Sequence, residues 1–362
     1  MMRFRLTLPL TVAVATLSLL AFAATAGAIT YAAIDHPGPA LDVPSSLLAE
    51  SLSCTSGLNA AKRDPVLLIP GTTVDPSEAY SWNYEKALAA QGIPYCAVTV
   101  PNHTDGDIQV AAEYVVYAVR YMHATSHHQV VMFGWSQGAS TLPRWALRFW
   151  PDIRPMVASL VGLAPLNYTG SVVASAACAG GSCVPAAWQQ AVGSHFMAAL
   201  DSRQVTFPNI AYTVIYTRDD DVVTPNVNGQ LSILPAGPNV TNVATQSICP
   251  TDLSEHLTLI ASPAAYAVAI NAIDHPGHPA DLAEVHASQP CLPGTMPGVD
   301  PSDFVGEEAH IVADVGPRLL EGMVDTEPAL KCYVTASCPA PHAKLKPRAR
   351  RHRSRSRSRR SP

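Results

Sequence analysis

Short apolar runs alternate with longer runs of helical periodicity along most of the chain. The short runs hold four to eight residues and are rich in β-branched side chains, as buried strands are. We expect strands over 66–69, 94–100, 129–135, 159–164 and 210–217, and helices over 84–90, 107–123, 140–149 and 186–200. Such alternation predicts an α/β fold, a single domain built on a doubly wound, mostly parallel sheet.

The expected strand 129–135 runs directly into a G-x-S-x-G motif, Gly134-Trp135-Ser136-Gln137-Gly138. A serine at a sharp turn between a strand and a helix has its hydroxyl pushed out above the sheet, and the flanking glycines let the two elements approach. The motif therefore predicts Ser136 as a nucleophile. The alternative is an ordinary turn, because so short a pattern also arises by chance in a chain with 21 glycines.

A serine nucleophile needs a base and an orienting carboxylate, which in hydrolases of this architecture follow in the order Ser, Asp/Glu, His. Asp219, Asp220 and Asp221 come directly after the expected strand 210–217, where active sites of open α/β sheets lie. The alternative is a solvated acidic turn. Seven histidines follow, and spacing favours His256, on a short loop before the helix-like run 257–273.

Several further segments match those of a known family. They are the stretch Leu67 to Thr72, the G-x-S-x-G turn at 134–138 (the elbow), the run WALRFWPDIR at 145–154, Leu163-Ala164-Pro165 and Trp188-Gln189-Gln190. Over about residues 41–331 the chain resembles the Candida antarctica lipase B-like family of α/β-hydrolases. The resemblance implies the α/β-hydrolase fold and the activity of a carboxylic ester hydrolase.

The resemblance also implies roles for individual residues. Ser136 is then the nucleophile, Asp220 the orienting acid and His256 the general base. The oxyanion hole would be formed by the backbone and hydroxyl donors of Thr72 and by the backbone N–H of Gln137. The substrate pocket would include Trp135 and Gln190.

The chain departs from the family pattern in two places. Pro143 lies inside the helix expected after the elbow, where it should remove a backbone hydrogen bond and kink the helix. The region Leu166 to Pro185 differs most, with Asn167 where the family has an aspartate. Because this region builds the pocket entrance in the family, substrate preference is the property least determined by the resemblance.

Eight cysteines, an even number, agree with an oxidising compartment. Sequence alone allows many pairings, and the resemblance implies the pairs Cys54 with Cys96, Cys249 with Cys291, Cys332 with Cys338 and, under that scheme, Cys178 with Cys183. No two cysteines have C-x-x-C spacing, so we expect no metal site, and the chemistry implies no cofactor.

The two ends of the chain differ from its body. Residues 1–28 carry two arginines, an apolar stretch and small residues ending in Ala28, which predicts a secretory signal peptide; an uncleaved membrane anchor is the alternative. The hydrolase domain is expected over 29–338 and a disordered basic tail over 339–362, with ten Lys/Arg and no acid after position 343. Without the signal and the tail, 11 of the 23 basic residues remain against all 28 acidic ones.

These features together predict a secreted or envelope-associated serine ester hydrolase, acting as a monomer through an acyl-enzyme on lipid or other apolar esters, at a lipid interface. One alternative is an acyltransferase or narrow short-chain esterase with the same triad. Another is a non-catalytic surface-binding protein that uses the basic tail. The tail is expected to bind anionic lipid or an envelope polymer rather than nucleic acid, and a solvated terminus is the alternative.

Overall fold

The computed structural model describes residues 29–291 and 294–338. The expected signal peptide and basic tail lie outside these residues. The described helices are too short or too polar to cross a lipid bilayer.

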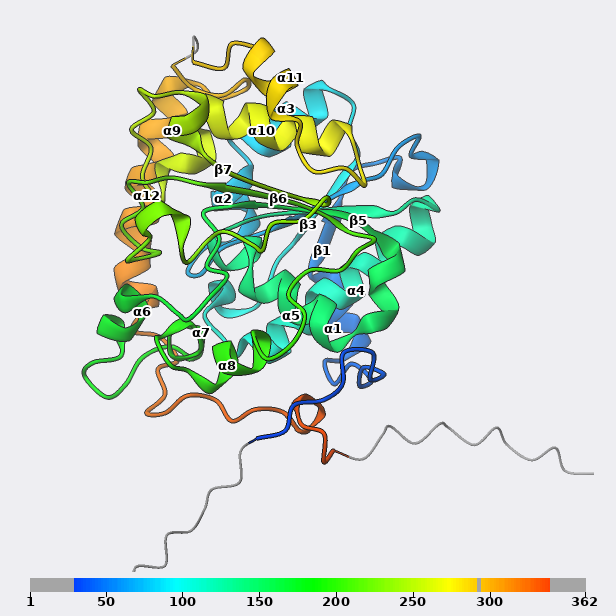
Figure 1. The fold of residues 1–362 in the computed structure, drawn as a ribbon, viewed down its shortest axis with the longest axis vertical. Helices are drawn as coiled ribbons and strands as arrows, with labels where there is room; N and C mark the ends of the chain where they lie inside the picture. Colours follow the sequence, from blue (N-terminus) through cyan, green and yellow to red (C-terminus); the bar gives the residue numbers. More distant parts are fainter. Residues whose placement is uncertain (1–28, 292–293, 339–362) are drawn as a thin grey trace, which may run out of the picture.

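The centre of the molecule is a seven-stranded sheet with helices on both faces (Figure 1). The strand order is β1-β3-β2-β4-β5-β6-β7, and only β1 runs antiparallel to its neighbour. The strands are β1 Leu52–Cys54, β2 Val66–Ile69, β3 Tyr95–Val98, β4 Val130–Trp135, β5 Val157–Leu163, β6 Ala211–Tyr216 and β7 Val240–Ala244.

Twelve α-helices surround the sheet within the described ranges. Helices α1, α4, α5, α7 and α8 pack on one face, and α2, α3, α9, α10 and α11 on the other (Figure 1). Their bounds are α1 Ser45–Glu50, α2 Pro76–Tyr80, α3 Tyr84–Ala90, α4 Ile108–Ser126, α5 Thr141–Phe149, α6 Val172–Ala177, α7 Pro185–Gln190, α8 His195–Leu200, α9 Thr245–Ile248, α10 Pro263–Asp274, α11 Leu282–Ala287 and α12 Pro301–Arg318.

The central strands are buried because both of their faces meet a hydrophobic core. In β2, Leu67 and Ile69 belong to the core on one side, whereas Val66 and Leu68 belong to the core on the other. Every residue of β2, β4 and β5 is buried. Strands covered on both faces read as continuous apolar runs, which explains why the sequence reveals them.

The predicted strands appear as β2 to β6, but the two edge strands were not predicted. The predicted helix 186–200 is wrong as one element, because the chain turns at Gly193 with a φ of 78° and separates α7 from α8. The predicted kink at Pro143 is also wrong. Helix α5 begins at Thr141, so Pro143 falls in the first turn, where backbone N–H groups have no helical acceptor to lose.

Four disulfides join the cysteines in the pairs that the family resemblance implied. Cys54 and Cys96 face each other across β1 and β3, and Cys249 and Cys291 close an equally long loop of 42 positions. In the loop-entropy model each of these two bridges stabilises the folded state by about 4 kcal/mol.

Candidate active site

A tight turn after β4 carries Ser136. The serine has a left-handed backbone, with a φ of 58°, and begins a short 3-10 turn, Ser136–Ala139, that leads into α5. A Cβ added at Gly134 would lie 1.8 Å from the carbonyl oxygen of Gly138, and one added at Gly138 would lie 2.1 Å from that of Ile69. Both glycines are therefore sterically required, which is the reason the motif was informative.

Ser136, His256 and Asp220 form a continuous chain of hydrogen bonds. Nε2 of His256 lies 3.0 Å from Oγ of Ser136, and Nδ1 lies 3.0 and 3.1 Å from the two carboxylate oxygens of Asp220. With Asp220 ionised, Nδ1 carries the proton and Nε2 is left to accept one from the serine. The structure thus brings together the three residues that the sequence singled out.

Asp220 is distinguished from the two aspartates beside it by burial. Asp219 and Asp221 are exposed, whereas Asp220 is buried, and its Oδ1 also accepts backbone hydrogen bonds from Val222 and Val223 at 3.0 and 2.7 Å. These bonds fix the carboxylate at the end of β6. Of these three aspartates, Asp220 alone contacts a histidine of the described chain.

Two opposing effects act on the pKa of His256. Burial disfavours the protonated ring and lowers the pKa, but the charge of Asp220 and its hydrogen bond act in the other direction. The second effect wins, so the pKa of His256 lies above its usual value. A proton on the ring is therefore stabilised.

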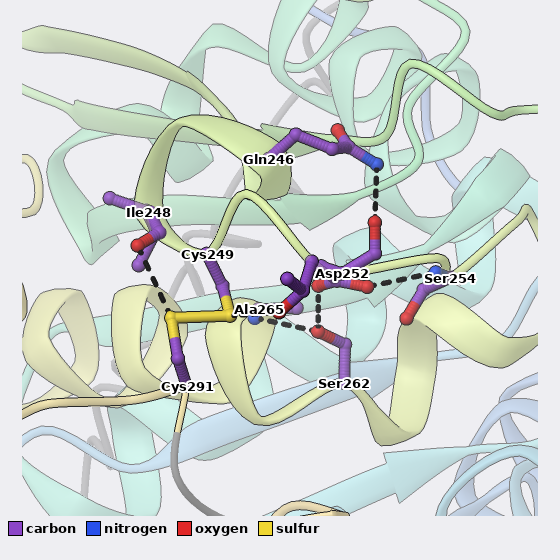
Figure 2. The surroundings of a disulfide bond; sticks show 9 residues. Gln246, Ile248, Cys249, Asp252, Ser254, Ser262, Ala265 and Cys291 are labelled. Atoms are coloured by element: carbon purple, nitrogen blue, oxygen red, sulfur yellow. Dashed lines mark hydrogen bonds between the residues drawn. A yellow bond between two sulfur atoms is a disulfide. The ribbon is translucent and has the colours of Figure 1, made fainter.

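The loop that holds His256 is fastened on both sides. Figure 2 shows the Cys249–Cys291 disulfide beside Asp252, whose carboxylate accepts hydrogen bonds from the Ser254 N–H at 2.8 Å and the Ser262 hydroxyl at 2.6 Å. Ser262 is also the N-cap of α10. The Asp252 carboxylate thus connects the loop between the disulfide and α10 to the N-cap residue of that helix.

Trp135 ties this loop to the elbow. Its indole Nε1 donates a 3.0 Å hydrogen bond to the backbone oxygen of His256, and the two rings are tilted with centroids 5.5 Å apart. Since Trp135 directly precedes the serine, one side chain sets the distance between the strand end and the histidine loop. Trp135 and Gln190, which the family resemblance assigns to the substrate pocket, both line a cavity above Ser136.

Thr72, Gln137 and Gln190 form a network beside the elbow. The Thr72 hydroxyl donates to Oε1 of Gln137 at 2.9 Å, and Nε2 of Gln190 donates to the Thr72 hydroxyl oxygen at 3.1 Å and to Oε1 of Gln137 at 3.0 Å. The backbone N–H of Gln137 lies at the start of a helical turn, where no acceptor exists within the turn. Sequence reasoning missed the side-chain amide of Gln137, which no spacing signals.

Asp105 supports the segment that carries Thr72, and it was also missed. Its Oδ1 accepts a 3.1 Å hydrogen bond from the backbone N–H of Thr73, a residue with a left-handed φ of 67°. Burial raises the pKa of Asp105 to about 7, although the hydrogen bond from Thr73 opposes this. The strained backbone after Thr72 is thus held by a buried carboxyl group.

A cavity of about 770 Å³ opens above Ser136 and is lined mainly by apolar side chains. Helix α6 contributes Val173, Ala174 and Ala177 to the lining, and residues of α12 form another side of the cavity. Helix α12 was not predicted from the sequence. Its cavity-lining residues nevertheless fall at the spacing of one helix face: 305, 308, 309, 311, 312 and 315.

One group of potential metal ligands, Asp75, Glu78 and His103, occurs in the described part of the chain. Arg318 donates to both carboxylate oxygens of Glu78, at 2.9 and 2.7 Å. A guanidinium thus already pairs with Glu78, and none of these three residues lines the cavity above Ser136.

The fold and this arrangement of serine, histidine and aspartate define an α/β-hydrolase. The chain is 30% identical over 237 residues to lipase B of Pseudozyma antarctica, formerly Candida antarctica, covering 65% of this chain and 69% of that protein. The crystal structure of Aspergillus fumigatus lipase B is similar at a TM-score of 0.74 and 25% identity, over 82% of this chain and 74% of that one. No family model matches the sequence. The chain belongs to the lipase B family and is a carboxylic ester hydrolase.

Proposed function

We propose that the chain is a secreted serine hydrolase that cleaves apolar esters through an acyl-enzyme. The observation that carries this proposal is the hydrogen-bonded chain from Ser136 through His256 to Asp220, with both links at 3.0 Å. A serine hydroxyl becomes a competent nucleophile when such a base is in hydrogen-bond reach and is itself oriented.

In the first half-reaction, Nε2 of His256 takes the proton of Ser136 as Oγ bonds to the ester carbonyl carbon. The carbonyl oxygen becomes an oxyanion, and collapse of this tetrahedral intermediate breaks the bond to the alcohol, which leaves with the proton from His256. In the second, water gives a proton to His256 and attacks the acyl-enzyme, and the acid leaves as Ser136 regains its proton. Asp220 stays ionised and stabilises the protonated ring.

The oxyanion is assigned to Thr72 and Gln137. The backbone N–H groups of the two residues supply fixed donors, and the Thr72 hydroxyl supplies a third when it turns away from the Gln137 side chain. Each donor aimed at the oxyanion contributes about 3 to 4 kcal/mol to the barrier reduction.

The cavity and its rim support an apolar substrate. Four of the apolar side chains that line the cavity are exposed, namely Val173, Val222, Val305 and Val312. Exposed apolar patches beside a cavity are typical of surfaces that contact apolar ligands or lipid.

Secretion is supported by the four disulfides and by the lack of any free cysteine among the described residues. Such bridges persist in oxidising compartments. The expected signal peptide is consistent with this but lies outside the described residues.

A substrate panel tests the proposal. We expect the purified protein to hydrolyse soluble p-nitrophenyl esters and emulsified triacylglycerols, since the cavity is large and apolar. Turnover of short soluble esters alone would indicate a narrow esterase. Acyl transfer to an added alcohol in preference to water would indicate an acyltransferase, and no ester turnover by folded protein would refute the proposal.

A further inference from the structure

One acidic side chain lies on the apolar wall that α12 presents to the cavity. Glu308 lines the cavity between Val305 and Val312, one helical turn from each, with Ala309 beside it. A carboxyl group on such a face costs free energy unless it finds a partner. Its presence there needs an explanation.

Glu308 has no such partner within the described ranges. Its Oε1 is buried and makes no hydrogen bond to any described residue. The other half-buried acid of the cavity, Glu255, does have hydrogen-bond partners. Its two oxygens accept hydrogen bonds from the backbone N–H groups of Leu257 at 2.7 Å and Thr258 at 2.8 Å. Glu308 is therefore the acid that has acceptor capacity to offer a ligand.

The charge of the cavity points in the same direction. The described lining contains three acidic residues, Asp221, Glu255 and Glu308, and no lysine or arginine. Arg318, on the same helix, is bound to Glu78 instead. The cavity thus disfavours anionic groups and favours groups that donate hydrogen bonds or carry positive charge.

We propose that Glu308 selects esters that carry a hydrogen-bond donor, a hydroxyl or an ammonium group, in the part of the substrate that lies along α12. The inference rests on the proposed function, because it names the substrate class of the same site. The apolar wall receives the hydrocarbon part of the ester, and Glu308 receives its one polar group. Glu308 as a whole is partly exposed, so a rotation of its carboxyl group toward the cavity would let the buried, unpaired oxygen accept this donor.

The protonation of Glu308 changes near neutral pH. Burial raises the pKa of Glu308 to about 7, and the charge of Glu255 adds to the effect. Below that pH the group is neutral, and above it the carboxylate attracts an ammonium group more strongly. The preference for an ammonium ester over an apolar one should therefore rise with pH through about 7.

Two matched ester series test the proposal, because the polar group could lie in either half of the substrate. One comprises p-nitrophenyl hexanoate and its analogues with a terminal hydroxyl or ammonium; the other comprises hexyl butyrate and the same two analogues. The measured quantity is the ratio of kcat/KM for the donor-bearing ester to that for its methyl-terminated parent. Glu308→Leu should lower this ratio about tenfold in one series, the effect of losing one charge-assisted hydrogen bond.

Two further variants assign the effect. Glu308→Gln keeps an acceptor but loses the charge, so it should lower the ammonium ratio and largely retain the hydroxyl ratio. Glu307→Leu, the matched control on the same helix, removes an acid that does not line the cavity and should leave both ratios unchanged.

The pH profile of the ammonium ratio adds a separate readout. The inflection near 7 should vanish in Glu308→Leu, although the neighbouring titratable groups remain; these are Asp221, Glu255 and His256 in the cavity and Glu307 and His310 on α12. Ionisation of His256 affects every ester alike and cancels in the ratio.

The outcomes separate the two proposals. If the protein hydrolyses the parent esters but Glu308→Leu leaves the ratios unchanged in both series, the role of Glu308 is overturned and the proposed function stands. The same conclusion follows if Glu307→Leu lowers the ratios as much as Glu308→Leu does. Failure of the folded wild-type protein to hydrolyse any ester would overturn the proposed function and this inference with it.

Discussion

The hydroxyl of Thr72 donates a 2.9 Å hydrogen bond to the side-chain Oε1 of Gln137, the residue that follows the elbow serine. Gln190 donates to both partners and holds the pair together. The hydroxyl is therefore already ordered at the edge of the cavity. Under the proposed mechanism it exchanges the Gln137 oxygen for the oxyanion.

Thr72→Val tests this exchange. The substitution keeps the shape of the side chain but removes its donor, so kcat should fall about a hundredfold or more while KM changes little. Steady-state kinetics on a p-nitrophenyl ester measures both. Unchanged kcat would mean that only backbone donors serve the oxyanion.

Asp220→Asn should lower turnover by about 10⁴, because an amide cannot hold the histidine in the tautomer that leaves Nε2 free to accept a proton. Asp219→Asn is the matched control, since Asp219 is exposed and its only described side-chain partner is Gln246 at 3.3 Å. Comparable losses from the two variants would show that the carboxylate assignment at the end of β6 is wrong.

The pH dependence of kcat/KM should report on His256. The ring acts as a base only when neutral, so activity should fall as the pH drops through its pKa. Because Asp220 raises that pKa, the midpoint of the acid limb should lie above the ordinary value of about 6.5. In Asp220→Asn the residual activity should show its acid limb at lower pH, and a limb that does not move would contradict the electrostatic role of Asp220.

Gly138→Ala should destabilise the fold, since the new Cβ would meet two backbone oxygens, those of Ile69 at 2.1 Å and Pro70 at 2.5 Å. Neither can move without displacing β2, so we expect the free energy of unfolding to fall by about 3 kcal/mol or more. Gly180→Ala, where the Cβ would meet nothing within 4 Å, is the control. Urea titration compares the two, and equal midpoints would contradict the steric account of the elbow.

The sheet could be predicted where burial left a clear pattern. Strands β2 to β6 are covered on both faces and read as apolar runs, whereas β1 has three partly exposed residues and β7 is broken by Asn242. The split between α7 and α8 depends on a short non-helical stretch, in which Ala191 and Ser194 are extended on either side of the left-handed Gly193. Local composition does not reveal such a turn.

The site could be predicted in part, for a similar reason. The order Ser, Asp, His and the family resemblance select the residues that the structure places in one hydrogen-bonded chain. The amide network of Gln137 and Gln190 and the carboxyl group of Glu308 could not be predicted, because each depends on segments far apart in sequence that meet only after folding.

In the proposed mechanism Ser136 attacks the ester and carries the acyl group. Reaction with a fluorophosphonate probe, followed by mass-spectrometric mapping and with ester hydrolysis measured in parallel, examines this role of the serine. We expect one probe per molecule, attached to Ser136, with activity lost in proportion, and neither labelling nor hydrolysis in a folded Ser136→Ala variant. Hydrolysis that persists in that variant, or a label on another residue that accounts for the lost activity, would contradict the mechanism.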